Sequence, residues 1–304
     1  MYAAHTAAMT GDTEHTLDAL LPAEMAAKAE QVGVTKANLP LHRLIPLGLL
    51  AGAFIALGAN FSAVVTADTA LSPGISRLLG GVVFSLGLIL VVISGAELFT
   101  GNTLIVMAYA SRRITARKLL RNWLVVYVSN FVGAAGVALL VVLSGRLQAG
   151  DGSLGTKALK TAATKADLGF GHAIVSGVLA NLLVCLAVWM TLSARTLVDK
   201  VVVIVPPIAA FVAAGYEHSV ANMYFFPAAL FHKAWAPDSF WAATDTTAGG
   251  YPHVTWARFL YDNLLPVTIG NILGGAVLVG LVYWFVFLKP AAPAAPTTPP
   301  ASTD

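Results

Sequence analysis

The chain of 304 residues has few charged residues, because lysine, arginine, aspartate and glutamate together make up only 11% of it. Hydrophobic residues make up 57%, and the mean hydropathy is +0.76. This composition is unlike that of a soluble domain and favours a protein that has lipid as its main solvent. The net charge of +3 does not indicate nucleic-acid binding, because the lysines and arginines are sparse and lie between apolar runs.

The sequence also lacks the motifs of several kinds of protein. Its single cysteine, Cys185, lies within an apolar run, so no internal disulfide is possible. No metal-binding histidine spacing, glycine-rich nucleotide loop or nucleophile–base pair is present, which argues against an enzyme, a cofactor and a metal site. The polar, acidic stretch Met1–Lys36 does not resemble a cleavable signal peptide.

The chain contains six apolar segments, each at least near the roughly 20 residues that a membrane-spanning helix needs. They are Leu44–Val65, Leu78–Ala110, Leu119–Leu143, Phe170–Leu192, Val201–Phe231 and Leu264–Leu288. The second and fifth are too long for a simple span and contain polar residues in their interior. The sequence therefore predicts an all-α integral membrane protein whose second and fifth spanning helices are broken.

The flanking segments predict three regions in the chain. Residues 1–43 are expected to form a cytoplasmic segment with an amphipathic helix that begins near Pro22. Residues 44–289 are expected to form the transmembrane channel domain, and residues 290–304 a disordered tail. Lysine and arginine are densest in the loop Arg112–Arg121, on the same side as both termini. This bias predicts a multi-pass protein of the inner membrane with both termini in the cytoplasm.

The two halves of the chain resemble each other. The interruption of the second segment begins Gly-Ala-Glu-Leu at Gly95, and that of the fifth begins Gly-Tyr-Glu-His at Gly215. Downstream, Asn122, Asn130 and Gly133 have the spacing of Asn263, Asn271 and Gly274. Each half has three spans, an odd number, so the halves are predicted to be inverted repeats in the membrane. In this architecture the transport site lies where the repeats meet.

The stretch Gly215–Pro227 places polar side chains within an apolar span, where they are costly unless they face a partner or a watery path. His218 and Asn222 are four residues apart, so they share a face if Ser219 begins a helix. Such a start would present the positive end of the helix dipole to an anion. Histidine also titrates near physiological pH. These residues predict a channel or transporter site.

Six stretches of the sequence resemble the formate/nitrite transporter family, and most closely its bacterial formate channels. They are Phe84–Leu90, Ala96–Thr100, Asn122–Tyr127, Leu179–Met190, Gly215–Pro227 and Asp262–Gly275. The resemblance implies an aquaporin-like fold with broken second and fifth helices, assembled as a homopentamer in the lipid bilayer. It also implies transport of a small monovalent anion, such as formate, nitrite, hydrosulfide, acetate or lactate, without nucleic acid or cofactor.

The resemblance also implies roles for particular residues. The residues matching the family's pore are His218, Asn222, Thr100 and Lys165. Those matching its apolar constrictions are Phe84, Leu88, Leu98, Phe99, Val184 and Phe211. Four buried polar residues are expected to support the broken helices, with the glutamates accepting backbone N–H bonds and the asparagines bonding neighbouring helices: Glu97, Glu217, Asn181 and Asn271.

The mechanistic hypothesis is that Lys165 and the helix dipoles attract an anion, which passes the constriction after a proton transfer linked to His218. A neutral acid is much less costly to bury than its anion. A nitrite or hydrosulfide channel would use nearly the same residues and stays an alternative. A water or glycerol channel is less favoured, because the interruptions read Glu-Leu-Phe-Thr and Glu-His-Ser-Val instead of a paired Asn-Pro-Ala.

Overall fold

A computed structural model describes residues 19–68, 70–149 and 151–289, and in these ranges all regular secondary structure is helical. Six helices are long and apolar enough to cross a membrane, which confirms the six predicted spans. They are α2 (Leu41–Ala67), α3 (Pro73–Ser94), α6 (Ala116–Leu143), α8 (Phe170–Ser193), α9 (Leu197–Ala214) and the continuous helix Arg258–Phe287. The chain is a multi-pass membrane protein.

The last span is divided by its hydrogen-bonding pattern. The α-helical parts are α12 (Leu265–Ile272) and α13 (Val282–Phe287), and the segments Arg258–Leu264 and Leu273–Leu281 are π-helical. Shorter helices complete the fold: α1 (Pro22–Ala37), α4 (Phe99–Asn102), α5 (Val106–Ala110), α7 (Ser153–Ala166), α10 (Ser219–Trp235) and α11 (Asp238–Ala243).

The second and fifth spans are broken where the sequence predicts it. Helix α3 ends at Gly95 and α9 ends at Gly215, with φ angles of 73° and 75°. Only glycine adopts this left-handed conformation without strain, so these two residues end their helices and turn the chain. Three further residues lie in extended or loop geometry before α4 and α10 begin. The breaks bring the loops 96–98 and 216–218 inside the bundle, where all of these residues except Tyr216 are buried.

The two halves use the same helix contacts. In the first half α2 packs against α3 and α6, and in the second half α8 packs against α9 and α12. The halves meet where α3 packs on α9 and where α10 packs on α6. The shared neighbours agree with the predicted repeat, and the inverted orientation of the halves in the membrane stays a prediction.

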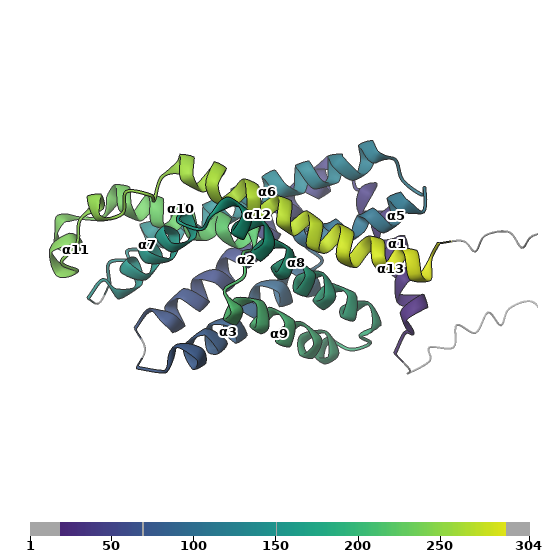
Figure 1. The fold of residues 1–304 in the computed structure, drawn as a ribbon, viewed down its shortest axis with the longest axis horizontal. Coiled ribbons are helices and arrows are strands. Elements are labelled where there is room, and N and C mark those ends of the chain that lie inside the picture. Colours follow the sequence, from purple (N-terminus) through teal and green to yellow (C-terminus); the bar gives the residue numbers. More distant parts are fainter. Residues whose placement is uncertain (1–18, 69, 150, 290–304) are drawn as a thin grey trace, which may run out of the picture.

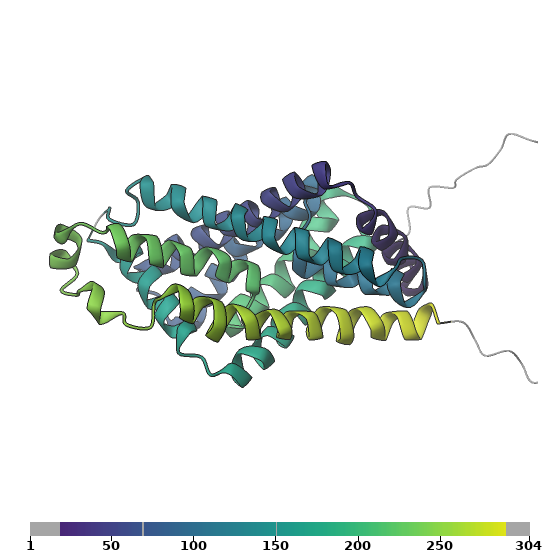
Figure 2. The ribbon, with the colours of Figure 1, turned by 90° about the horizontal axis from the view of Figure 1, so that it is seen from above.

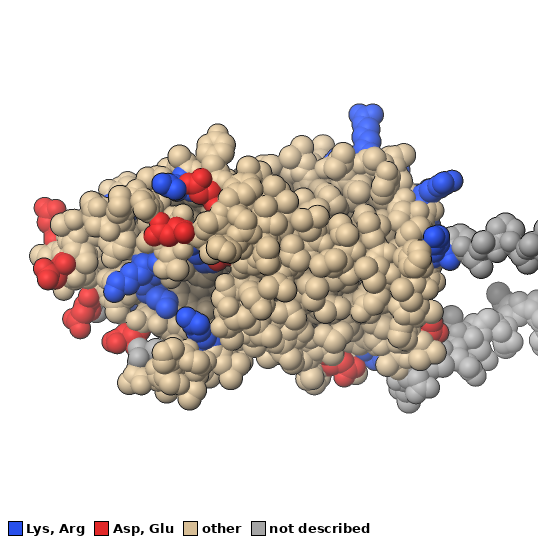
Figure 3. Space-filling view, viewed as in Figure 1, with Lys and Arg blue, Asp and Glu red and all other residues tan. Residues whose placement is uncertain are grey.

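The short helices gather at the two ends of the bundle. Helix α1 lies with α5 and α13 at one end, and α7 and α11 lie at the other (Figures 1 and 2). Charged side chains gather at these ends, while the middle of the face seen in Figure 3 is uncharged. Many large apolar side chains on the spanning helices are exposed, such as Leu124 and Leu140 of α6. This pattern fits a protein surrounded by lipid or by other copies of itself.

Helix α1 begins at Pro22, as the sequence predicts, and packs against α5 and α8. Of the predicted N-terminal segment 1–43, the structure describes the part from residue 19 onward. The predicted tail 290–304 lies outside the described residues.

Candidate functional site

A buried ion pair stabilises the break between α9 and α10. The Lys165 ammonium, on α7, donates to Glu217 Oε1 at 2.7 Å. The other oxygen of Glu217 accepts from Asn222 Nδ2 at 2.6 Å and from Asn263 Nδ2 at 3.3 Å. Residue Glu217 is only 4% exposed, and these donors satisfy both of its carboxylate oxygens.

The first half contains the same network around Glu97. The Lys36 ammonium, at the end of α1, donates to Glu97 Oε1 at 2.9 Å and to Asn102 Oδ1 at 3.0 Å. Asn102 Nδ2 donates to Glu97 Oε2 at 2.7 Å and to Asn122 Oδ1 at 3.0 Å. Lys36 therefore corresponds to Lys165.

Lys36 was missed in the sequence analysis. The sequence contains a pattern that could have indicated Lys36. Lys36 lies near the end of an amphipathic helix that precedes the first three spans, and Lys165 lies near the end of α7, which precedes the next three. Each half of the chain is thus an amphipathic helix with a lysine near its C-terminus, followed by three spans.

The predicted bonds from backbone N–H groups to the glutamates are wrong, because side chains bind both carboxylates. Asparagines hold the backbone of the breaks instead. Asn271 Oδ1 accepts from the Ser219 N–H at 2.9 Å. Its Nδ2 donates to the Glu217 carbonyl at 3.0 Å and to the Gly177 carbonyl at 2.8 Å. Asn271 therefore ties the break to α8, which agrees with its predicted supporting role.

Asn130 makes the matching bonds in the first half. Its Oδ1 accepts from the Phe99 N–H at 2.9 Å, and its Nδ2 donates to the Glu97 carbonyl at 2.9 Å and the Gly48 carbonyl at 2.7 Å. The repeat in the sequence predicts the position of Asn130 but does not indicate this role. Both asparagines are fully buried, so each bond is shielded from water.

Asn181 connects the two halves. Its Nδ2 lies 2.6 Å from the Asn271 carbonyl and 3.3 Å from the Thr100 carbonyl, which also accepts from Cys185 Sγ. Asn181 is therefore a helix-bonding amide, as predicted, and Thr100 is held by its backbone from α8.

His218 and Thr100 bring the two breaks together. His218 Nε2 lies 2.9 Å from Thr100 Oγ1, and both side chains are buried. His218 Nδ1 accepts from the Ala221 N–H at 3.1 Å, so the imidazole is the N-cap of α10. Because a backbone N–H can only donate, Nδ1 has a lone pair and a neutral His218 has its proton on Nε2. Nε2–H therefore donates to Thr100 Oγ1.

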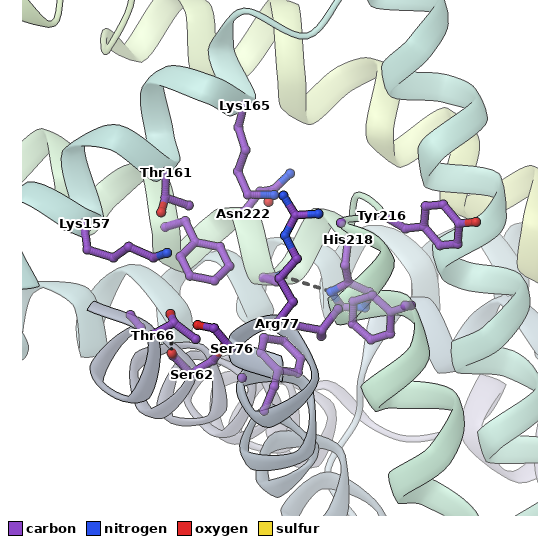
Figure 4. A pocket seen from close by; sticks show the side chains of 18 residues that line it. Ser62, Thr66, Ser76, Arg77, Lys157, Thr161, Lys165, Tyr216, His218 and Asn222 are labelled. Carbon is purple, nitrogen blue, oxygen red and sulfur yellow. Dashed lines mark hydrogen bonds between the residues drawn. The ribbon is translucent and has the colours of Figure 1, made fainter. Parts of the chain in front are cut away.

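Two cavities approach this pair from opposite ends of the bundle. The α7 cavity has a volume of about 270 Å³ and contains Lys165, Asn222 and His218 in its wall (Figure 4). The α1 cavity has a volume of about 250 Å³ and is lined on one side by Lys36 and Glu97. Each cavity is thus lined by a lysine that is paired with a buried glutamate, and of the two glutamates Glu97 also lines its cavity.

A central cavity of about 10 Å³ lies between the other two. Phe84, Phe211 and His218 are shared by its wall and the α7 cavity, and Leu88 and Leu98 are shared with the α1 cavity. Its remaining lining residues are Ile55, Val184 and Ile208. This volume is about that of one water probe, and His218 is its only polar lining residue among those described. The passage between the larger cavities is therefore narrow and apolar.

The structure places five of the six predicted constriction residues around the central cavity. The exception is Phe99, whose ring packs edge-on against Tyr127 at 4.8 Å between centroids and against Trp123. Phe99 is the first residue of α4, its N–H donates to Asn130 Oδ1, and its ring lies against α6. Ile55 and Ile208 were not predicted, because single apolar residues within apolar helices have no distinguishing signal.

Asn222 lines the α7 cavity as predicted, but its amide N–H groups are already bonded to Glu217 and Asn263. Its buried Oδ1 has no hydrogen-bond partner among the described residues. Within those residues, no group of three histidine, cysteine or acidic side chains is arranged to hold a metal ion.

Comparisons with a family model and with individual proteins indicate the same family. The family model described as formate/nitrite transporter matches residues 23–285. The chain is 46% identical over 277 residues to the formate channel FocA of Escherichia coli K12, covering 91% of this chain and 97% of that protein. It is 40% identical over 264 residues to the formate channel FocA of Haemophilus influenzae, covering 86% and 93%.

A solved structure described as a pentameric formate channel with formate bound has the same fold. It superposes with a TM-score of 0.78 and 43% sequence identity, covering 82% of this chain and 98% of the other. These relatives are channels and not enzymes. The chain belongs to the formate/nitrite transporter family.

Proposed function

We propose that this protein is a formate channel. The observation that supports it best is the meeting of two charged cavities at a narrow apolar passage beside the His218–Thr100 pair. A passage of this kind rejects hydrated ions, because removing water from a charge is costly. The names of its relatives and the formate-bound structure support formate as the anion.

The anion is attracted into either cavity by a lysine. Lys165 serves the α7 cavity and Lys36 the α1 cavity. Each ammonium is paired with a buried glutamate, which fixes its position and reduces its net attraction, so an anion is drawn in without being held tightly. The N-terminus of α10 adds its positive dipole end near His218.

Passage through the central cavity requires a neutral acid. A neutral imidazole is a poor acid, so His218 first takes up a proton at Nδ1 from water in the α7 cavity, which breaks the bond from the Ala221 N–H. The imidazolium then gives its Nε2 proton through Thr100 Oγ1 to the anion. The ring is then neutral with its proton on Nδ1. The starting tautomer returns when Nε2 takes a proton from water through Thr100 Oγ1 and Nδ1 releases its proton to water in the α7 cavity, so that Nδ1 again accepts from the Ala221 N–H.

The proposed assembly is a homopentamer in the inner membrane, with both termini in the cytoplasm and α7 on the outer side. The pentameric relative supports the first point, and the dense basic loop Arg112–Arg121 supports the orientation. Residues 44–289 form the channel, and α1 contributes Lys36 to its cytoplasmic cavity.

The proposed selectivity is tested by anion flux. Purified protein in liposomes should pass formate. Comparing its flux with the flux of nitrite, hydrosulfide, acetate and lactate should give the order in which the channel prefers these anions. Flux should rise as the pH falls from about 8 to about 5, because the transferable proton becomes more available. Stopped-flow measurement of internal pH or ion-selective electrodes would report the rates. Flux of a neutral polyol without flux of any anion would overturn the proposal.

Shortening Phe211 to alanine is expected to widen the passage. Its ring lies edge-on to Phe84, with centroids 5.6 Å apart, so its loss removes one side of the apolar wall. Chloride, which cannot be carried as a weak acid at neutral pH, should then leak through. Single-channel or liposome chloride flux would detect this, with Phe231→Ala as the control because Phe231 lies outside the central cavity. Unchanged exclusion of chloride would remove Phe211 from the constriction.

A further inference from the structure

The wide part of the α7 cavity contains two cationic side chains that the proposed transport path does not use. Arg77, near the start of α3, and Lys157, on α7, both point into it with Lys165 (Figure 4). Lys165 is paired with Glu217, but no acidic residue lines this cavity within the described part of the chain. Arg77 and Lys157 also have no ion pair there. Their two positive charges are therefore uncompensated.

Hydroxyl groups surround the same space. Four of them, from three different helices, lie in the cavity wall: Ser62, Thr66, Ser76 and Thr161 (Figure 4). The Thr66 hydroxyl donates to the Ser62 carbonyl at 2.8 Å, and the other three have no side-chain hydrogen bond among the described residues. Hydroxyls beside unpaired cations are the groups that bind the oxygens of a small oxyanion.

The position of Lys157 on α7 places its charge inward. Lys157, Thr161 and Lys165 are spaced four residues apart, so they share one face of the helix. Lys157 is half-buried, and this burial together with the nearby Arg77 charge lowers the pKa of its ammonium. A bound anion would relieve both effects. Lys160, on the same helix, is exposed and does not line the cavity.

We propose that Arg77 and Lys157, with the surrounding hydroxyls, form a second anion-binding site where a small carboxylate or similar oxyanion is held before it reaches Lys165 and His218. The Arg77 guanidinium binds two oxygens of the anion side by side, and Lys157 contributes a point charge. This site raises the anion concentration at the mouth of the passage. The inference rests on the proposed function, because it concerns loading of the same channel.

The site also predicts a side-specific blocker. Sulfate has the oxygens that the site binds, but it has two charges, so a single proton does not neutralise it and it cannot cross the narrow apolar passage. Sulfate should therefore occupy the site from the α7 side and slow formate flux, whereas sulfate on the opposite side should have little effect.

The test uses the full-length protein in planar bilayers, with formate current measured against formate and sulfate concentration on each side. Arg77→Gln and Lys157→Gln should each raise the formate concentration for half-maximal current by about threefold, and together by about tenfold. The difference in current between these variants and the unaltered protein should become smaller as the formate concentration is raised. The sulfate concentration for half-block should rise by about tenfold in the double variant. Arg77→Lys should keep the half-maximal formate concentration near that of the unaltered protein. Its sulfate concentration for half-block should be restored only in part, because lysine lacks the guanidinium fork.

Lys160→Gln is the matched control, since it removes the same charge from an exposed position of the same helix. Equal effects in this control would overturn the site in favour of general surface charge. Unchanged half-maximal concentrations and sulfate block in folded Arg77→Gln and Lys157→Gln proteins would also overturn it, and size-exclusion elution would establish that they are folded. Absence of any formate current in the unaltered protein would instead overturn the proposed function.

Discussion

Replacement of His218 by asparagine is expected to lower formate flux by about tenfold or more and to flatten its dependence on pH. The asparagine side chain is a good N-cap, so its oxygen can still accept from the Ala221 N–H and keep the start of α10 intact. What the variant loses is the only titratable group in the central cavity among the described residues. The anion then has to cross the apolar passage without a proton donor beside it.

Liposome flux at several pH values would measure this effect, and thermal unfolding would show that the fold is retained. His172→Asn is the control, because His172 is exposed and lies outside all three cavities. Thr100→Val should behave like the His218 variant, since it removes the hydroxyl that accepts from Nε2. Equal flux and an equal pH profile in His218→Asn would show that the histidine only caps α10.

Replacement of Asn271 by leucine is expected to destabilise the protein by roughly 3 kcal/mol or more. The two side chains have the same number and branching of non-hydrogen atoms, so the change removes the hydrogen bonds and replaces the amide with two somewhat larger methyl groups. It leaves the Ser219 N–H and the carbonyls of Glu217 and Gly177 buried and without this partner. Buried backbone groups without partners are especially costly inside a membrane.

Thermal unfolding in detergent would measure the loss for this variant. Asn130→Leu should cost a similar amount, because Asn130 makes the matching three bonds in the other half. Asn38→Leu, at an exposed helix end, should cost far less. A melting temperature for Asn271→Leu equal to that of Asn38→Leu would show that the break does not depend on this amide.

The membrane spans and their interruptions could be predicted from the sequence, because lipid imposes simple requirements on a chain. A spanning helix needs about 20 apolar residues, and a polar side chain within it is costly unless it has a polar partner or faces water. Gly95 and Gly215 end their helices as expected, with left-handed φ angles. The resemblance of the two halves also placed Asn130 and Asn271 at equivalent positions before their contacts were known.

The partners within the site depend on contacts between distant parts of the chain, which sequence spacing does not show. Glu97 was expected to accept from nearby backbone, but it is bound by Lys36 from α1. Phe99 is predicted at the constriction, but its ring packs against Trp123 and Tyr127 of α6.

Six membrane spans and two polar breaks follow from the sequence alone, because hydrophobic length and glycine conformation act locally along the chain. The folded structure is needed to place the proton of His218 on Nε2, since this follows from the Ala221 N–H on one side of the ring and the Thr100 hydroxyl on the other. It also decided that Arg77 and Lys157 face one cavity. The tautomer of His218 and the shared cavity of Arg77 and Lys157 depend on distances between side chains of separate helices, and these distances are set by how the helices pack.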